Sequence, residues 1–127
     1  MYTISHDEFE NIINKAVSSL PAIYVERLDN VAFIIEDQPS PMQRQQLRLQ
    51  NNQTLFGLYE GLPLSKRQGR TKLIPDKITL FKLPLEQSSN TLAELRDHIS
   101  RTIWHEVAHY YGLDHGRIEE LEAGEHQ

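Results

Sequence analysis

The 127-residue sequence contains no cysteine, so it can form neither a disulfide nor a thiolate metal site. It has no basic excess either, because 18 acidic and 13 basic side chains give a net charge of −5. Proteins that bind phosphate backbones are usually basic, so we expect no nucleic-acid partner. No apolar run approaches the ~20 residues of a membrane span, and residues 1–8 lack the features of a secretory signal. We therefore expect a cytoplasmic protein without membrane contact, in which any metal is held by histidine, aspartate or glutamate.

The length and the composition indicate a single folded domain over residues 1–127. A chain of 127 residues can bury one hydrophobic core but not two. Its hydrophobic fraction of 39% and its charged fraction of 24% are ordinary for a soluble globular protein. The densest basic segment, residues 66–72, lies in a predicted loop, and we interpret it as solvated rather than as a binding patch.

Two helices can be placed by the residues at their ends. Residues 5–8 read Ser-His-Asp-Glu and residues 91–94 read Thr-Leu-Ala-Glu, and both fit the capping box that begins many helices. Apolar residues follow each box at spacings of three and four, which predicts amphipathic helices facing a common core. Pro21 is expected to end the first helix, and Gly112 the second, because glycine readily adopts the left-handed conformation found at helix ends.

Three segments have the character of β-strands. Residues 31–35 form a short continuous apolar run, which is typical of a strand buried on both faces. Residues 55–60 predict a second strand, in which Gly57 allows a close backbone approach. Residues 77–83 begin with alternating polarity and lie between two prolines, which favours an edge strand.

The connections are read as surface loops. Residues 38–54 keep no regular period, so we expect a long surface excursion with at most a helical turn within residues 47–52. Residues 65–75 look like a flexible loop that could flank a substrate. Together these elements predict an α+β fold, with a small mixed sheet of three or four strands packed on the N-terminal helix and the long helix.

Residues 105–115 read His-Glu-Val-Ala-His-Tyr-Tyr-Gly-Leu-Asp-His, which is H-E-x-x-H extended to H-E-x-x-H-x-x-G-x-x-H. His105 and His109 are four residues apart, so a helix places both imidazoles on one face, one turn apart. Two such imidazoles can reach one tetrahedral zinc at Zn–N distances of roughly 2.0–2.1 Å. Glu106 projects about 100° round the helix, where its carboxylate can hold a water beside the ion without binding the metal.

Gly112 makes a third histidine ligand possible. On a straight helix His115 would lie about 15 Å beyond His105, too far to share an ion. A sharp turn at Gly112 could instead fold His115 back under the metal, giving three protein ligands and one vacant position, as in a catalytic zinc site. His98 lies two turns before His105 and is expected to take no part, and Trp104 is expected to pack behind the site.

The order of several blocks resembles a known family. The motif is similar to that of metzincin proteases, but those carry a methionine turn well downstream of the third histidine. The only methionines here are Met1 and Met42. A closer resemblance is to the minimal zincins, a family of small bacterial metallopeptidases. It is carried by LFGLYEGLPL at 55–64, LIPDKITLF at 73–81 and the zinc motif, whose eleventh position is aspartate or histidine in that family and His115 here.

The resemblance implies a stripped-down zincin fold, a Zn²⁺ cofactor and a peptide or protein substrate. Zincins lay an extended peptide along an edge strand beside the zinc helix, a role that would here fall to residues 77–83. In zinc peptidases a tyrosine or histidine often stabilises the oxyanion of the transition state. Tyr59 is the candidate for that role, and the alternative is a strand tyrosine at the rim of the core.

The expected reaction is hydrolysis of a peptide bond. Zinc held by His105, His109 and His115 lowers the pKa of its bound water toward ~7, and Glu106 takes the water's proton and delivers it to the leaving amine. Two alternatives stay open. The spacing H-x₃-H-x₅-H also resembles the metal motif of a bacterial endoribonuclease family of ribosomal RNA maturation, although that family has glycine where Glu106 stands. The chain could also be a metal-binding module without physiological catalysis.

Overall fold

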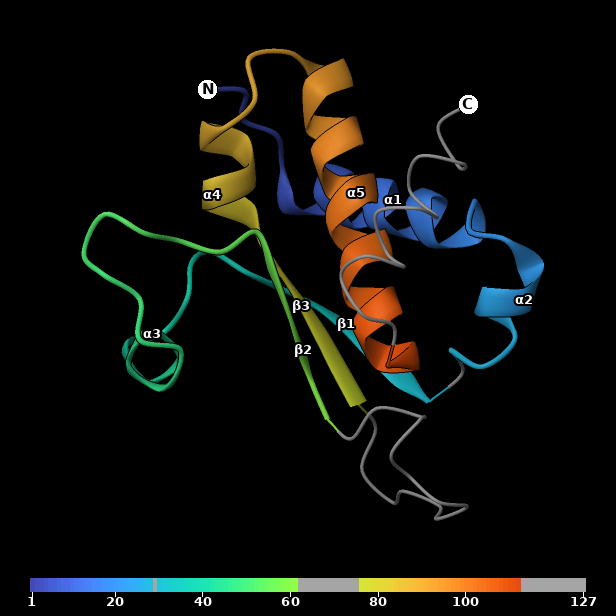
Figure 1. The fold of residues 1–127 in the computed structure, drawn as a ribbon. Coiled ribbons are helices and arrows are strands. Elements are labelled where there is room, and N and C mark those ends of the chain that lie inside the picture. The colour runs from blue at the N-terminus through green and yellow to red at the C-terminus, as the bar shows by residue number, and fades with distance from the viewer. Residues whose placement is uncertain (29, 62–75, 113–127) are drawn as a thin grey trace.

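A computed structural model describes residues 1–28, 30–61 and 76–112, and these ranges form a helical layer packed on a small sheet (Figure 1). In chain order the elements are α1 (His6–Ser18), α2 (Ala22–Val25), β1 (Val31–Glu36), α3 (Pro41–Gln46), β2 (Gly57–Glu60), β3 (Asp76–Phe81), α4 (Lys82–Gln87) and α5 (Leu92–Tyr111). The predicted α+β class and the predicted small mixed sheet are therefore confirmed. No helix in the described ranges is both long and apolar enough to cross a membrane.

The sheet has the order β1-β3-β2, so β3 is its central strand. β1 pairs with β3 in parallel from Val31 opposite Asp76, and β2 pairs with β3 antiparallel from Gly57 opposite Leu80. Ile78 and Leu80 of β3 are completely buried. The prediction that residues 77–83 form an edge strand is wrong. One of the two prolines that suggested an edge, Pro84, lies beyond the strand in α4 and removes no hydrogen bond from the sheet.

β1 is one of the two edge strands, and the prediction that residues 31–35 are buried on both faces is wrong. All six residues of β1 are only half-buried. Val31, Phe33 and Ile35 pack against the core, whereas Ile34 points to the opposite face of the sheet. A continuous apolar run does not distinguish a strand covered on two faces from an edge strand covered on one.

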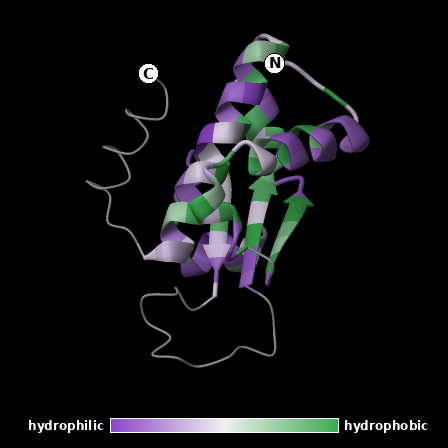
Figure 2. Cartoon of the chain, turned by 90° about the vertical axis from the view of Figure 1, so that its right-hand side faces the viewer, coloured by the Kyte–Doolittle hydropathy of each residue, from purple (hydrophilic) through white to green (hydrophobic). Residues whose placement is uncertain are grey.

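Both main helices begin where their sequences predict, and α5 also ends there, whereas α1 ends at Ser18, before Pro21. Ser5 Oγ accepts a hydrogen bond from the Glu8 N–H at 3.1 Å at the start of α1, and Thr91 Oγ1 accepts one from the Glu94 N–H at 3.1 Å at the start of α5. α5 ends at Gly112, which has the left-handed conformation with φ 78°. Figure 2 shows hydrophobic and hydrophilic stretches alternating along the helices, as expected of helices with one buried side. α5 packs on β2, β3 and α1, so it lies between the sheet and the N-terminal helix.

The loop between β1 and β2 contains a short helix that lies outside the predicted range of residues 47–52. α3 occupies Pro41–Gln46, not residues 47–52, and it starts with a complete capping box formed by Ser40 and Gln43. Pro41 stands in the first turn of α3, where a proline loses no hydrogen bond and favours the start of a helix. The guanidinium of Arg44 then donates to two backbone carbonyls, those of Gln50 and Gln53, at 2.6 and 2.7 Å.

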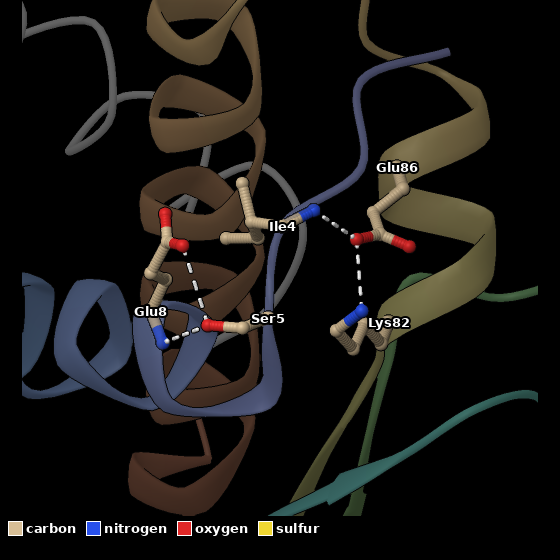
Figure 3. A network of polar contacts seen from close by, with 5 residues as sticks. All are labelled: Ile4, Ser5, Glu8, Lys82 and Glu86. Atoms are coloured by element: carbon tan, nitrogen blue, oxygen red, sulfur yellow. Dashed lines mark hydrogen bonds and ion pairs between the residues drawn. The ribbon is translucent and has the colours of Figure 1, made fainter.

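A buried carboxylate connects the N-terminus to α4, and no pattern in the sequence predicted it (Figure 3). Glu86 is completely buried, and its Oε2 accepts from the Ile4 backbone N–H and from Lys82 Nζ, each at 2.9 Å. The Glu86 carbonyl also accepts from the Tyr2 N–H at 3.1 Å. This network fixes the residues that precede α1 beside α4, while Phe9 and Ile13 of α1 enter the core.

Candidate active site

The last turns of α5 bring His105, Glu106 and His109 together. The centroids of the two imidazole rings are 5.3 Å apart and their planes are inclined by 76°. Both imidazoles are partly exposed, so an ion can approach them from solvent. His115 lies outside the described residues, and its role as third ligand stays a prediction.

Glu106 is held in place by the backbone of β2. Its side chain is mostly buried, and its Oε1 accepts a hydrogen bond from the Tyr59 N–H at 2.8 Å. The same oxygen lies 3.4 Å from His109 Nδ1. The carboxylate is therefore fixed between an edge strand and one of the two imidazoles. This contact could not be predicted from the sequence, because the donor is a backbone N–H, which nearly every residue type has.

The carboxylate also changes the proton affinity of its neighbour. The side-chain hydrogen bond to Glu106 raises the pKa of His109 above its ordinary value of 6.5, partial burial opposes this, and the negative charge of Glu106 adds to it. In the metal-free protein His109 therefore holds its proton more strongly than a free imidazole. A metal ion must displace that proton before it can bind this nitrogen.

Gly57 allows β2 to lie this close to α5. A Cβ at position 57 would be 2.6 Å from Thr102 Cγ2, 3.2 Å from the Thr79 carbonyl oxygen and 3.3 Å from Glu106 Cγ. The first distance is far below van der Waals contact, so a side chain here would push the strand and the helix apart. The prediction that Gly57 permits a close approach is confirmed, and the element approached is α5.

A cavity of about 400 Å³ opens directly beside this site. Residues of β2, of the segment before it and of α5 line the cavity: Thr54, Leu55, Phe56, Gly57, Arg101, Thr102, His105 and Glu106. The imidazole of His105 and the buried carboxylate of Glu106 therefore both border this cavity. Another cavity, of about 320 Å³, lies between α1 and α5, and its described lining does not include His105, Glu106 or His109.

Tyr59 contributes its backbone to the site, whereas its side chain packs elsewhere. Its ring makes an edge contact with Tyr110 at 5.9 Å between centroids. Its hydroxyl donates to Oδ2 of Asp76, a buried carboxylate, at 2.7 Å. This arrangement favours the structural interpretation of Tyr59 over the oxyanion role.

Two other aromatic side chains of α5 take the expected structural positions. His98 Nδ1 is 2.8 Å from Ser89 Oγ, and its ring stacks on Phe56 at an interplanar angle of 14°. Trp104 is only 4% exposed and packs edge-on against Tyr24. Both residues support the helix that carries the motif.

A separate group of possible ligand atoms lies at the start of α1. His6, Asp7 and Glu10 place one such atom each within 4.8 Å of one another, but all three side chains are exposed. Acidic residues are common in the first turn of a helix because they complement its dipole. The cluster therefore needs no metal to explain it.

The decisive comparison is with protein families. The sequence model described as zincin-like metallopeptidase matches residues 28–125 of this chain. The chain belongs to the zincin-like metallopeptidase family. The predicted resemblance is thereby confirmed over most of the sequence, and the observed fold is that of a small zincin. A search of curated proteins finds no match to this zincin.

The family implies zinc, and the donor set of this zincin fits that ion. Zinc in proteins is held by thiolates, imidazoles and carboxylates, and the sequence offers no thiolate. Two imidazoles one helical turn apart, with a carboxylate fixed beside them, match the nitrogen donors and the neighbouring base of a catalytic site.

Proposed function

We propose that this zincin is a zinc-dependent peptidase in which His105, His109 and His115 hold the metal and Glu106 carries the proton. The observation that supports this most strongly is the fixed position of the Glu106 carboxylate, 2.8 Å from the Tyr59 N–H and 3.4 Å from an imidazole nitrogen of His109. A carboxylate tied to an edge strand in this way is held beside the ion's ligands as a base.

The two oxygens of Glu106 have different surroundings. Oε1 accepts from the Tyr59 N–H and faces His109. Oε2 accepts no hydrogen bond from residues 1–28, 30–61 and 76–112. Oε2 can therefore accept a proton while Oε1 keeps the carboxylate in place.

Zinc, when bound, lowers the pKa of a water and polarises the scissile carbonyl. Glu106 accepts the proton of the attacking water at Oε2, which increases the nucleophilicity of that water. Glu106 then transfers the proton to the nitrogen of the leaving amine.

The substrate backbone would lie along β2 rather than along β3. The Phe81 N–H donates to the Phe56 carbonyl at 2.9 Å, so the backbone groups of Phe56 face β3. Strand alternation turns the N–H and carbonyl of Gly57 to the opposite side, the side on which the Tyr59 N–H meets Glu106. An extended peptide added to this edge would pass in front of α5.

The test is a peptide-library cleavage screen on zinc-loaded protein, with wild type and Glu106→Gln compared at equal metal content. The glutamine keeps the size of the side chain and an oxygen for the Tyr59 N–H, but it cannot carry the proton. We expect wild type to cleave peptides, and the variant to be slower by about 10²–10⁴-fold with zinc retained. Equal rates for the two proteins would refute the role of Glu106.

The same preparation tests the two alternatives. Cleavage of RNA with all peptides left intact would favour the endoribonuclease. A stable zinc complex with a fourth protein ligand and no turnover would favour the metal-binding module. Neither alternative gives a proton-carrying role to a carboxylate at position 106.

A further inference from the structure

We propose that the cavity beside Glu106 is a substrate subsite that binds a carboxylate on a residue flanking the scissile bond, with Arg101 as its partner. The inference rests on the proposed peptidase function and adds the chemical class of the substrate. Three properties of the cavity support it: the reacting groups line the cavity, part of its wall is apolar, and its described lining includes the permanent cation of Arg101.

The cavity is continuous with the candidate active site. His105 and Glu106 line it, and Arg101 lies one helical turn earlier on α5, about 6 Å along the axis from His105. A peptide whose scissile bond lies at Glu106 would place a neighbouring side chain in this space. The occupant is therefore a residue next to the cleaved bond or very close to it.

The wall of the cavity is suited to the aliphatic part of such a residue. Leu55 and Phe56 line it on the side of β2, and Phe56 is 38% exposed although it is a large apolar residue. Its ring is held in place by stacking on His98. Gly57 and Thr102 also line the cavity, at the point where the missing side chain of Gly57 lets β2 contact α5 closely.

Arg101 provides the charge that selects the occupant. Among the described residues that line the cavity, it is the only lysine or arginine. Its Nε donates to Asp97 Oδ2 at 2.8 Å, which restricts the orientation of the guanidinium. Its terminal nitrogens have no hydrogen-bond partner within the described ranges, and the side chain is 53% exposed. Two nitrogens of a restrained guanidinium can bind a carboxylate in bidentate fashion.

Two sources can supply that carboxylate. One is the side chain of glutamate or aspartate next to the scissile bond, and the other is the C-terminal carboxylate of a short peptide. Both would meet the same guanidinium, whereas a lysine side chain would be repelled by it. Peptides with free and with amidated C-termini distinguish the two sources.

The experiment measures kcat/KM of zinc-loaded wild type for peptide pairs that differ only by Glu against Gln at each flank of the cleaved bond. A parallel series compares free acids with amides. We expect a preference of about tenfold for the charged member of one pair, the size of one hydrogen bond to a charged group. Binding of the same peptides to zinc-loaded Glu106→Gln, followed by fluorescence anisotropy, should show the same preference without turnover.

Variants of Arg101 should remove or reverse the preference. Arg101→Gln should make the paired peptides equivalent, and Arg101→Glu should favour Lys over Glu at the same flank. Arg96→Gln is the matched control, because Arg96 is a cation of the same helix that lines the other cavity instead. It should leave the preference unchanged.

The experiments give different results when only the subsite is wrong and when the peptidase function is wrong. Equal cleavage of all paired peptides by wild type, or a preference that survives Arg101→Gln, overturns the subsite and leaves the peptidase intact. Absence of cleavage overturns the peptidase, and the anisotropy series then decides the subsite. Charge-independent binding in that series overturns it.

Discussion

Two buried glutamates in this small zincin have opposite surroundings. Glu86 is completely buried, lies 2.9 Å from the ammonium of Lys82 and receives the Ile4 N–H, so a permanent cation balances its charge. Glu106 is 8% exposed, is held by the single N–H of Tyr59, and has an imidazole rather than a permanent cation beside it. Glu86 is sealed inside the fold, whereas Glu106 borders a cavity.

The difference between the two glutamates shows that a buried carboxylate can have either a structural or a chemical role. A buried carboxylate paired with lysine fixes the elements around it. A buried carboxylate beside imidazoles and an open cavity can exchange a proton with a substrate. The following predictions test whether the two glutamates differ in this way.

The largest expected effect comes from removing His109. Its imidazole lies beside Glu106, whereas Glu86 has a lysine beside it. His109→Ala should weaken zinc binding by at least about 100-fold, since a direct ligand matters more than the outer contacts for which 10–100-fold is typical. The measurement is zinc content after dialysis against a weak chelator. His98→Ala is the control on the same helix, and equal zinc content in the two variants would contradict the assignment.

The second prediction concerns Glu86. Glu86→Ala leaves Lys82 without its partner and should lower the free energy of unfolding by about 3–5 kcal/mol. Urea unfolding of the metal-free protein measures this. Glu106→Gln should have a much smaller effect on the same quantity, because its amide oxygen can still accept from the Tyr59 N–H. If both substitutions cost the same stability, the contrast between the two residues fails.

A third prediction separates the position of Glu106 from its chemistry. Gly57→Ala should cost about 1–3 kcal/mol of stability by overpacking and should reduce kcat, because the added methyl group displaces Thr102 and Glu106. Thr102→Ser removes the methyl group that lies 2.6 Å from the new Cβ. The double variant should therefore recover much of both losses. A double variant no better than Gly57→Ala would show that the close approach is not what positions the carboxylate.

The smallest effect is a pH dependence in the metal-free protein. The pKa of His109 is raised above 6.5 in the native state, mainly by its hydrogen bond to Glu106. The resulting stabilisation is fully present below pH 6.5 and is lost as the pH rises through the higher native pKa. It should stay below about 1 kcal/mol because the imidazole is partly exposed. Urea unfolding at several pH values should show this loss in wild type and not in Glu106→Gln, and the opposite slope would contradict it.

The sequence predicts the helices well because their determinants are local. The capping residues at 5–8 and 91–94 and the stop at Gly112 act within a few residues of the positions they define. The order of the strands depends on pairing between distant segments. For that reason the central position of β3 and the edge position of β1 were both misread.

The motif likewise predicts the site residues His105, Glu106 and His109, but it does not predict the contacts that fix their positions. The Tyr59 N–H reaches Glu106 across 47 residues, and the Ile4 N–H reaches Glu86 across 82. Every residue type carries a backbone N–H, so neither contact could be read from composition or spacing. Gly57 was the one indication in the sequence that two elements meet closely at this point.

The most direct test of the proposed centre is X-ray absorption at the zinc edge of the metal-loaded protein, with His115→Ala measured alongside. We expect wild type to show three imidazole nitrogens at roughly 2.0–2.1 Å together with one non-protein oxygen, and the variant to lose one imidazole. An identical spectrum from the variant, or a fourth protein ligand in wild type, would contradict a hydrolytic zinc site built on α5.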